Sequence, residues 1–342
     1  SQRGNAAAAG TAVYMTSYPR TDEDREWENI LPVRKWLYQT PEQILIKASN
    51  GASDFGNKFG QPLIAGSVLT FEHQENGEQY GYDKVIMLAG GVGYGTKRDC
   101  LKGTPQKGNK VVVVGGDNYR IGLGGGSVSS VDTGRYSSGI ELNAVQRANP
   151  EMQKRANNLV RALCEEDVNP VVSIHDHGSA GHVNCLSELV EDCGGLIDMS
   201  KLPIGDKTLS AKEIIANESQ ERMGLLIQEE HIEHVRKIAE RERAPMYVVG
   251  ETTGDAHFAF QQADGVRPFD LEVAQMFGHS PKTYMHDTTV ERKYENVTYD
   301  VTKLNEYVAK VLRLEAVACK DWLTNKVDRS VRRPRSWRRS RS

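Results

Sequence analysis

An acidic residue at the end of an apolar run is the first feature of this sequence that could do chemistry. Asp176 follows the run Pro170–Ile174, and two glycines come within the next five positions. Open α/β sheets place ligand-binding residues at such strand ends. A hard cation such as Mg²⁺ takes oxygen ligands and usually bridges to substrate phosphates, so Asp176 is a candidate metal ligand. The flanking His175 and His177 would need a third donor to bind zinc, and we identify none.

A second polar group stands between a predicted helix and an apolar strand. Glu218, Ser219 and Gln220 offer a carboxylate, a hydroxyl and an amide in series, which could hold the hydroxyls and amides of a small ligand. An ordinary charged connector explains these three residues equally well on residue types alone. Gln146, at a predicted helix start, is on the same grounds a solvated side chain.

A strand and a glycine-rich loop are predicted to position these groups. Gly108–Gly116 contains four consecutive valines between Gly108 and the pair Gly115–Gly116, a pattern typical of a buried strand. In the following loop, Ile121–Ser130, glycines would let backbone N–H groups approach a ligand. The loop lacks the Lys of a Walker A sequence and the spacing of a dinucleotide fingerprint. Taken alone, it is better explained as a close-packed turn than as a phosphate contact.

Helical and strand patterns alternate from about residue 108 to residue 291, which indicates a layered α/β domain. Pro150–Cys164 is predicted to be an amphipathic helix. Upstream, Thr40–Ser49 has a capping threonine followed by proline and is predicted to be a helix. Asn50–Pro62 is predicted to be a long polar, glycine-rich loop.

Composition and charge narrow the class of protein. A chain of 342 residues suits two domains, because single cores stop growing at roughly 250–300 residues. No apolar run approaches the roughly 20 residues that cross a bilayer. The five cysteines form no CxxC pair, which favours a reducing compartment, and we expect a cytoplasmic protein. Six arginines within residues 332–341 could bind nucleic acid, but their abruptness favours an artefact of the reading frame.

Seven segments, taken together and in order, resemble phosphoribosylformylglycinamidine synthase of the large, single-chain type. The similarity is collinear from about Gly10 to Tyr299. The segments that carry it are NGASDFGNKFGQP, VIMLAGGVG, the run from Gly115 to Ser130, AVQRANPEM, SIHDHGSAGHVN, NESQERM and RERAPMYVVGETTG. ESQER and VQRANPEM argue against another member of the superfamily, such as aminoimidazole ribonucleotide synthetase.

This resemblance implies an α/β fold of the PurM or AIR-synthetase type. Residues 1–107 would then be the C-terminal part of a small N-terminal-type domain, and residues 108–292 a complete large C-terminal-type domain. Residues 293–330 would be a linker and the start of the next domain. Residues 331–342 would be a basic tail outside the fold.

The resemblance also implies the activity. The family uses ATP and Mg²⁺ to join ammonia from glutamine to formylglycinamide ribonucleotide, in purine biosynthesis. By position, Gln146 and Glu218–Gln220 match residues that contact the substrate, and Asp176 matches a metal ligand. Gly81 and Tyr82 fall where large members contact nucleotide.

Several parts of the family's machinery have no counterpart in this sequence. We find neither the segment with the catalytic histidine, nor the second half of the synthetase core, nor the glutaminase domain, and we assign no catalytic residue. The chain is therefore predicted to be an internal fragment that is inactive alone, with those missing parts as its partners. If it self-associates, an exposed apolar sheet face is the expected cause. A nucleic-acid-binding module acting through the arginine tail is the alternative from another class, and we expect no nucleic-acid partner.

Overall fold

A computed structural model describes residues 7–147, 149–289, 291 and 293–327. The chain divides into two units, which we describe separately. The first is Gly93–His279, and the second combines residues 7–92 with the described part of 280–342. The arginines at 332–341 lie outside the described residues.

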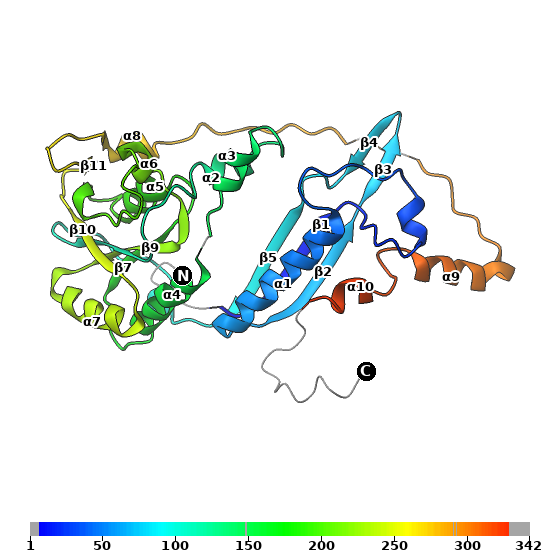
Figure 1. The fold of residues 1–342 in the computed structure, drawn as a ribbon, viewed down its shortest axis with the longest axis horizontal. Helices are drawn as coiled ribbons and strands as arrows, with labels where there is room; N and C mark the ends of the chain where they lie inside the picture. The colour runs from blue at the N-terminus through cyan, green and yellow to red at the C-terminus, as the bar shows by residue number, and fades with distance from the viewer. Residues whose placement is uncertain (1–6, 148, 290, 292, 328–342) are drawn as a thin grey trace. The chain divides into compact units, whose positions relative to one another are not determined.

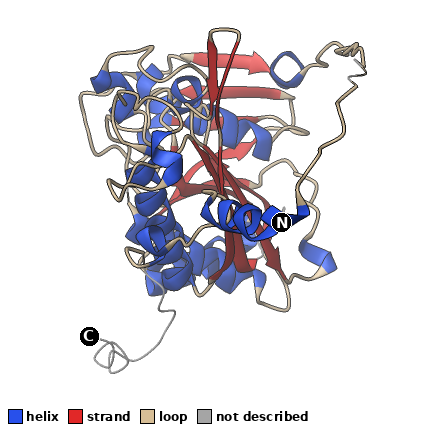
Figure 2. Cartoon of the chain, turned by 90° about the vertical axis from the view of Figure 1, so that its right-hand side faces the viewer, coloured by secondary structure: helices blue, strands red, loops and turns tan. Residues whose placement is uncertain are grey.

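The first unit is built on a seven-stranded mixed sheet with the order β12-β11-β8-β10-β6-β9-β7. Its strands are β6 (Lys110–Val114), β7 (Val171–His177), β8 (Gly195–Asp198), β9 (Ser219–Ile227), β10 (Met246–Thr252), β11 (His257–Gln261) and β12 (Phe269–Glu272). Its helices are α2 (Gly125–Ser129), α3 (Ser138–Asn143), α4 (Pro150–Cys164), α5 (Gly181–Leu189), α6 (Ala211–Ile215), α7 (Ile232–Glu242) and α8 (Val273–Phe277). Helices and strands are thus mixed through the unit (Figure 2), and the predicted α/β class is confirmed.

Strand β6 is an interior strand of this sheet, between β10 and β9, and contributes side chains to the core on both faces. Val111 and Val113 pack in one cluster with residues of α5 and α6, whereas Val112 and Val114 pack in a second with residues of α4 and α7. Side chains of a strand alternate between the two faces, so four consecutive valines require cover on both. Figure 1 shows α4 and α7 together on one side of the sheet and α5 and α6 on the other.

The predicted helix Pro150–Cys164 is confirmed as α4, and its first turn is capped. The Asn149 side chain caps it by accepting a hydrogen bond from the backbone N–H of Met152 at 3.0 Å. Pro150 occupies the first helical position, where no backbone donor is needed. Two of its apolar residues, Leu159 and Leu163, are fully buried against the sheet.

The second unit contains a three-stranded sheet, β2-β1-β5, and a separate hairpin. Its strands are β1 (Ala7–Thr16), β2 (Leu63–Thr70), β3 (Glu72–Glu75), β4 (Glu78–Gly81) and β5 (Ile86–Gly93), which runs one residue into the first unit. Its helices are α1 (Pro41–Phe59), α9 (Leu304–Arg313) and α10 (Asp321–Thr324). A small core joins α1 and α10 to β1 through Tyr14, Leu45 and Trp322.

The predicted loop Asn50–Pro62 is wrong over most of its length, because α1 continues to Phe59. The capping box at Thr40 starts the helix as expected. Gly60 ends it in the left-handed conformation, with φ of 71°. Stacking of Phe55 on Phe59, with ring centroids 4.2 Å apart, helps to stabilise a stretch whose glycines favour a loop.

The sequence around residue 76 forms more regular structure than its polar character indicates. Asn76 and Gly77 both have positive φ, and they close the antiparallel hairpin β3–β4. No helix of the described residues is long and apolar enough to span a membrane. The five cysteines are free. The structure divides the chain at Gly93 and His279. The domain boundaries predicted from the sequence, after residues 107 and 292, stay predictions.

Candidate functional site

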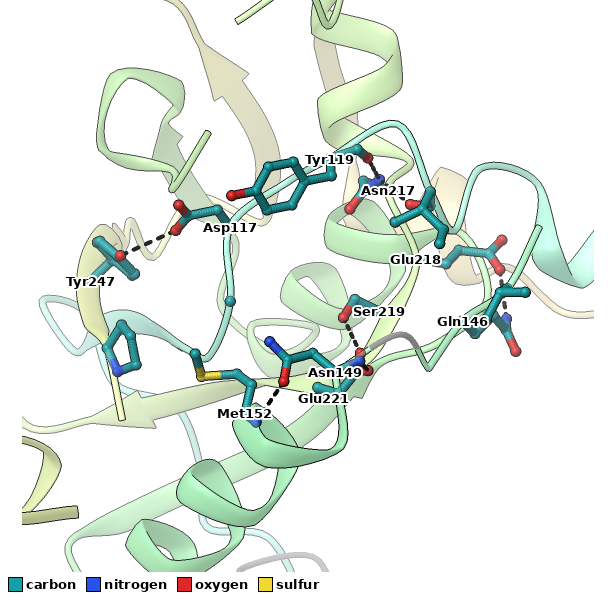
Figure 3. A pocket seen from close by; sticks show the side chains of 14 residues that line it. Asp117, Tyr119, Gln146, Asn149, Met152, Asn217, Glu218, Ser219, Glu221 and Tyr247 are labelled. Carbon is teal, nitrogen blue, oxygen red and sulfur yellow. Dashed lines mark hydrogen bonds between the residues drawn. The ribbon is translucent and has the colours of Figure 1, made fainter. Parts of the chain in front are cut away.

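A pocket of about 380 Å³ lies in the first unit, where loops after β6 and before α4 meet the start of β9. Figure 3 shows Glu218 and Gln146 hydrogen-bonded to each other at one end of this pocket, and Asp117 and Tyr247 at the other end. Three of the predicted substrate residues line it: Gln146, Glu218 and Ser219. Gln146 is 72 residues away from Glu218 in sequence, so the fold brings it to Glu218 and Ser219. The remaining lining residues are Gly116, Asp117, Tyr119, Ile121, Val145, Asn149, Met152, Asn217, Glu221, Pro245 and Tyr247.

Glu218 is the centre of this arrangement. The residue is only 4% exposed, yet no lysine or arginine is among the hydrogen-bond donors to its carboxylate. It accepts hydrogen bonds from the Gln146 side-chain amide at 2.5 Å, from the Gly126 backbone at 3.0 Å and from the Ala180 backbone at 3.1 Å. These donors orient both oxygens, and a carboxylate has lone pairs for further donors. A neutral ligand with N–H or O–H groups suits such a site.

The glycine-rich loop packs directly on Glu218. At Gly122, whose φ is +80°, an added Cβ would lie 1.8 Å from the carbonyl oxygen of Glu218. At Gly125 it would lie 2.5 Å from a Glu218 carboxylate oxygen, closer than real Cβ atoms come. These glycines are therefore needed for the close approach of the loop to this side chain. The interpretation of the loop as a close-packed turn fits this geometry.

A buried guanidinium lies in β9, at Arg222. Arg222 is fully buried, and burial lowers its pKa to about 10, so it stays charged at neutral pH. It donates to the Asn217 carbonyl at 2.9 Å and to the Asn118 side chain, and its Nη1 is 2.9 Å from Nε2 of His182. Because Asn217 in turn donates to the carbonyls of Tyr119 and Ile121, one cation fixes two walls of the pocket.

His177 and His182 complete this buried cluster. Their ring nitrogens Nε2 and Nδ1 are 2.9 Å apart, and both side chains are fully buried. Burial, and then the charge of Arg222, holds the pKa of each imidazole well below its ordinary value. Both are therefore neutral at physiological pH, which is compatible with a neighbouring cation.

Sequence reasoning missed Glu221 and Asn149. Glu221 is 4% exposed and accepts hydrogen bonds from the Ser219 hydroxyl at 2.6 Å and from the Asn149 backbone. Alternation along β9 was the available signal, since Ser219 and Glu221 point into the pocket whereas Arg222 does not. The Asn-Pro pair at 149 was the available signal for a helix cap.

Asp176 and Gln220 do not line the pocket. Asp176 is exposed near the end of β7, as expected. The side chains of Asp176 and Gln220 both lie next to Gly178. A Cβ added at Gly178 would be 2.8 Å from Asp176 Oδ1 and 3.5 Å from Gln220 Nε2. Gln220 is linked to the pocket, since its side-chain amide donates to Gln146 Oε1 at 3.4 Å.

The described residues contain no cluster of three or more His, Cys, Asp or Glu side chains that could hold a metal ion by itself. One accessible carboxylate is nevertheless enough for Mg²⁺ when water and ligand phosphates supply most of its oxygens. Asp176 fits that role, and the neighbouring Gln220 amide could contribute a further oxygen.

Gly81 and Tyr82, the predicted nucleotide contacts, lie at the end of β4 in the second unit. A Cβ at Gly81 would lie 3.1 Å from Ser17 Oγ and 3.4 Å from Arg34 Nη2. Arg34 donates to Ser17 Oγ at 2.6 Å and pairs with Asp83. A cation and a hydroxyl thus lie beside Gly81, and its contact with nucleotide stays a prediction.

Comparison with known proteins identifies the relatives of this chain. Residues 106–262 match the family model for the C-terminal domain of AIR synthase related proteins. Phosphoribosylformylglycinamidine synthase of Dictyostelium discoideum is 38% identical over 96% of this chain, and the human protein of the same name is 36% identical over 96%. The chain spans about a quarter of the length of these relatives, 25% and 26% respectively. The resemblance inferred from the motifs is confirmed.

Solved structures confirm the fold. Thermotoga maritima PurL complexed with FGAR superposes with a TM-score of 0.62 at 19% identity, covering 87% of this chain and 44% of that one. The same protein complexed with ATP gives a TM-score of 0.55 at 18% identity, covering 86% and 42%.

Proposed function

We propose that this chain forms part of a phosphoribosylformylglycinamidine synthase, because residues 106–262 match the family model for the C-terminal domain of AIR synthase related proteins and 96% of the chain aligns with such enzymes. The enzyme would be an ATP-dependent amidotransferase-ligase of purine biosynthesis. It would convert formylglycinamide ribonucleotide, glutamine and ATP into formylglycinamidine ribonucleotide, glutamate, ADP and phosphate. This chain would supply part of the wall that binds the ribonucleotide.

The observation that carries this proposal is the Gln146–Glu218 pair in the pocket. The Glu218 carboxylate would accept a hydrogen bond from an N–H of the substrate's amides, as it now does from Gln146. Gln146 and Ser219 would hold neighbouring polar atoms of the substrate. Because the Glu218 oxygens are fixed by backbone donors of Gly126 and Ala180, they need little reorganisation when a ligand binds.

Asp176 would hold Mg²⁺, with Gln220 beside it, and Gly81 and Tyr82 would contact ATP. Mg²⁺ neutralises phosphate charge and so favours transfer of a phosphoryl group to an amide oxygen. The Arg34 guanidinium lies next to Gly81, and a phosphate of the ligand would share it with Asp83.

The proposal includes the remainder of a longer enzyme. The motifs that match carry no catalytic histidine and no glutaminase nucleophile, so the chain alone should bind substrate without turning it over. The second half of the core and the glutaminase domain would be its partners. The free cysteines support a reducing, cytoplasmic setting.

Titration calorimetry with formylglycinamide ribonucleotide tests this function. We expect saturable binding to the wild-type chain and affinity at least tenfold weaker for Glu218→Gln, since a hydrogen bond to a charged group contributes about 1.5–3 kcal/mol. Glu240→Gln, an exposed change on α7, is the matched control and should bind like the wild type. A parallel phosphate-release assay with ammonia and ATP should show no turnover.

Absence of saturable binding by the wild-type chain would contradict the proposal. So would a Glu218→Gln chain with unchanged affinity.

A further inference from the structure

The pocket has a second end that the proposed function leaves unused. Opposite the Gln146–Glu218 pair, it is lined by Asp117 and Tyr119 from the loop after β6 and by Tyr247 of β10 (Figure 3). The antiparallel pairing of β6 with β10, which sets Val114 opposite Met246, brings Asp117 and Tyr247 together.

Asp117 is an exposed carboxylate with capacity for more hydrogen bonds. The Tyr247 hydroxyl donates to its Oδ1 over 3.4 Å, a long hydrogen bond. The two carboxylate oxygens together offer about four lone pairs. Asp117 can therefore accept from two adjacent ligand hydroxyls at once.

The aromatic ring of Tyr119 provides a flat surface, and its contact with Gly205 fixes its position. A Cβ at Gly205 would lie 2.3 Å from Cζ and 2.7 Å from the hydroxyl oxygen of Tyr119, so this ring lies directly on the Gly205 backbone. The Gly205 N–H in turn donates to the Asn118 carbonyl at 2.9 Å. The rest of the side chain is open, since 53% of Tyr119 is exposed.

The charges of the lining select the kind of ligand. Asp117, Glu218 and Glu221 contribute three carboxylates, and the lining residues include no lysine or arginine. Such a lining favours neutral groups that donate hydrogen bonds, namely hydroxyls and amide N–H groups. It disfavours phosphate, because like charges repel, so the phosphate of a bound ribonucleotide would lie outside this lining.

We propose that Asp117, Tyr119 and Tyr247 form a ribose subsite, in which Asp117 accepts hydrogen bonds from the vicinal hydroxyls and the sugar packs on the Tyr119 ring. The inference rests on the proposed function for the identity of the ribonucleotide. It adds to that function the part of the pocket that binds the sugar. A carboxylate on ribose hydroxyls is also how dinucleotide-binding folds recognise this sugar. The amide part of the ligand then lies at Glu218.

The test compares formylglycinamide ribonucleotide with its 2-deoxyribose analogue by titration calorimetry on the full chain. We expect the wild type to bind the ribose form at least tenfold more tightly, because one hydrogen bond to a charged acceptor is lost in the analogue. Asp117→Asn should bind the ribose form about tenfold more weakly and lose most of the discrimination. Asp264→Asn, an exposed change outside the pocket, is the control and should keep it.

The outcomes separate the two proposals. Equal affinity of the wild type for both ligands, or full discrimination by Asp117→Asn, overturns the subsite and leaves the proposed function standing. Binding of neither ligand by the wild type overturns both. Thermal unfolding of each variant shows that a change in affinity is not a loss of fold.

Discussion

Two strands with similarly apolar sequences have opposite surroundings in the two units. In β6 all four valines are completely buried. In β5 every residue is exposed, including Met87 at 56% and Leu88 at 52%. The two strands differ in what covers them, because β6 is an interior strand of a sheet with helices packed on both faces. An apolar run therefore indicates a strand, whereas its burial depends on elements far away in sequence.

The largest expected effect comes from the same substitution in each unit. Leu225→Ala, in the fully buried part of β9, should lower the unfolding free energy of the first unit by about 2–5 kcal/mol through lost burial and a cavity. Leu88→Ala, in exposed β5, should change that of the second unit by less than about 0.5 kcal/mol. Hydrogen exchange resolved by peptide measures both. Equal losses would mean that β5 is buried in solution.

A smaller effect tests the electrostatics of the first unit. Asp99 is fully buried, and hydrogen bonds, first from Arg98 and then from Thr96 and Asn169, lower its pKa from 3.8 to about 2. A lowered folded-state pKa gives stability that is complete above the unfolded value and is lost as pH falls toward 2. We expect a contribution of about 1–2 kcal/mol at neutral pH.

Urea unfolding at pH 6 and pH 2.5 measures this contribution. The wild type should lose more stability between the two than Asp99→Asn, whose amide does not titrate in this range. Parallel losses would show that Asp99 is not the group responsible.

The smallest effect concerns the helix ends, where the two units are alike. Thr40 in the second unit and Ser210 in the first both form complete capping boxes. Thr40→Ala and Ser210→Ala should each cost about 1 kcal/mol in their own unit. Similar losses in hydrogen-exchange protection of α1 and α6 would show that the units differ in packing and not in local chemistry. A cost confined to one unit would contradict this.

The sequence predicted the parts of the fold that have local causes. The four valines of β6 predicted a buried strand, and the apolar spacing of Pro150–Cys164 predicted the helix α4. The end of α1 could not be predicted, because its glycines, Gly51 and Gly56, favour a loop. What overrides them is packing: Leu45 is fully buried against β1, and Phe55 stacks on Phe59.

The candidate site shows the same limit. Gln146, Glu218 and Ser219 were found through motifs, and the structure places all three in one pocket. Their roles stay predictions. Asp117 and Tyr247 are 130 residues apart and meet only through the register of β6 and β10, which neither residue's own surroundings indicate.

The donors to Glu218 have a practical consequence. Gly126, Gln146 and Ala180 come from three separate stretches of chain and meet on one side chain. A shortened gene product that removed or unfolded any one of these stretches would leave the almost completely buried Glu218 without one of its donors. The cost of burying that unsatisfied carboxylate would also destabilise the contacts of the other two stretches with it. Expression boundaries placed anywhere between residues 126 and 218 should therefore abolish the site outright instead of yielding a weaker version of it.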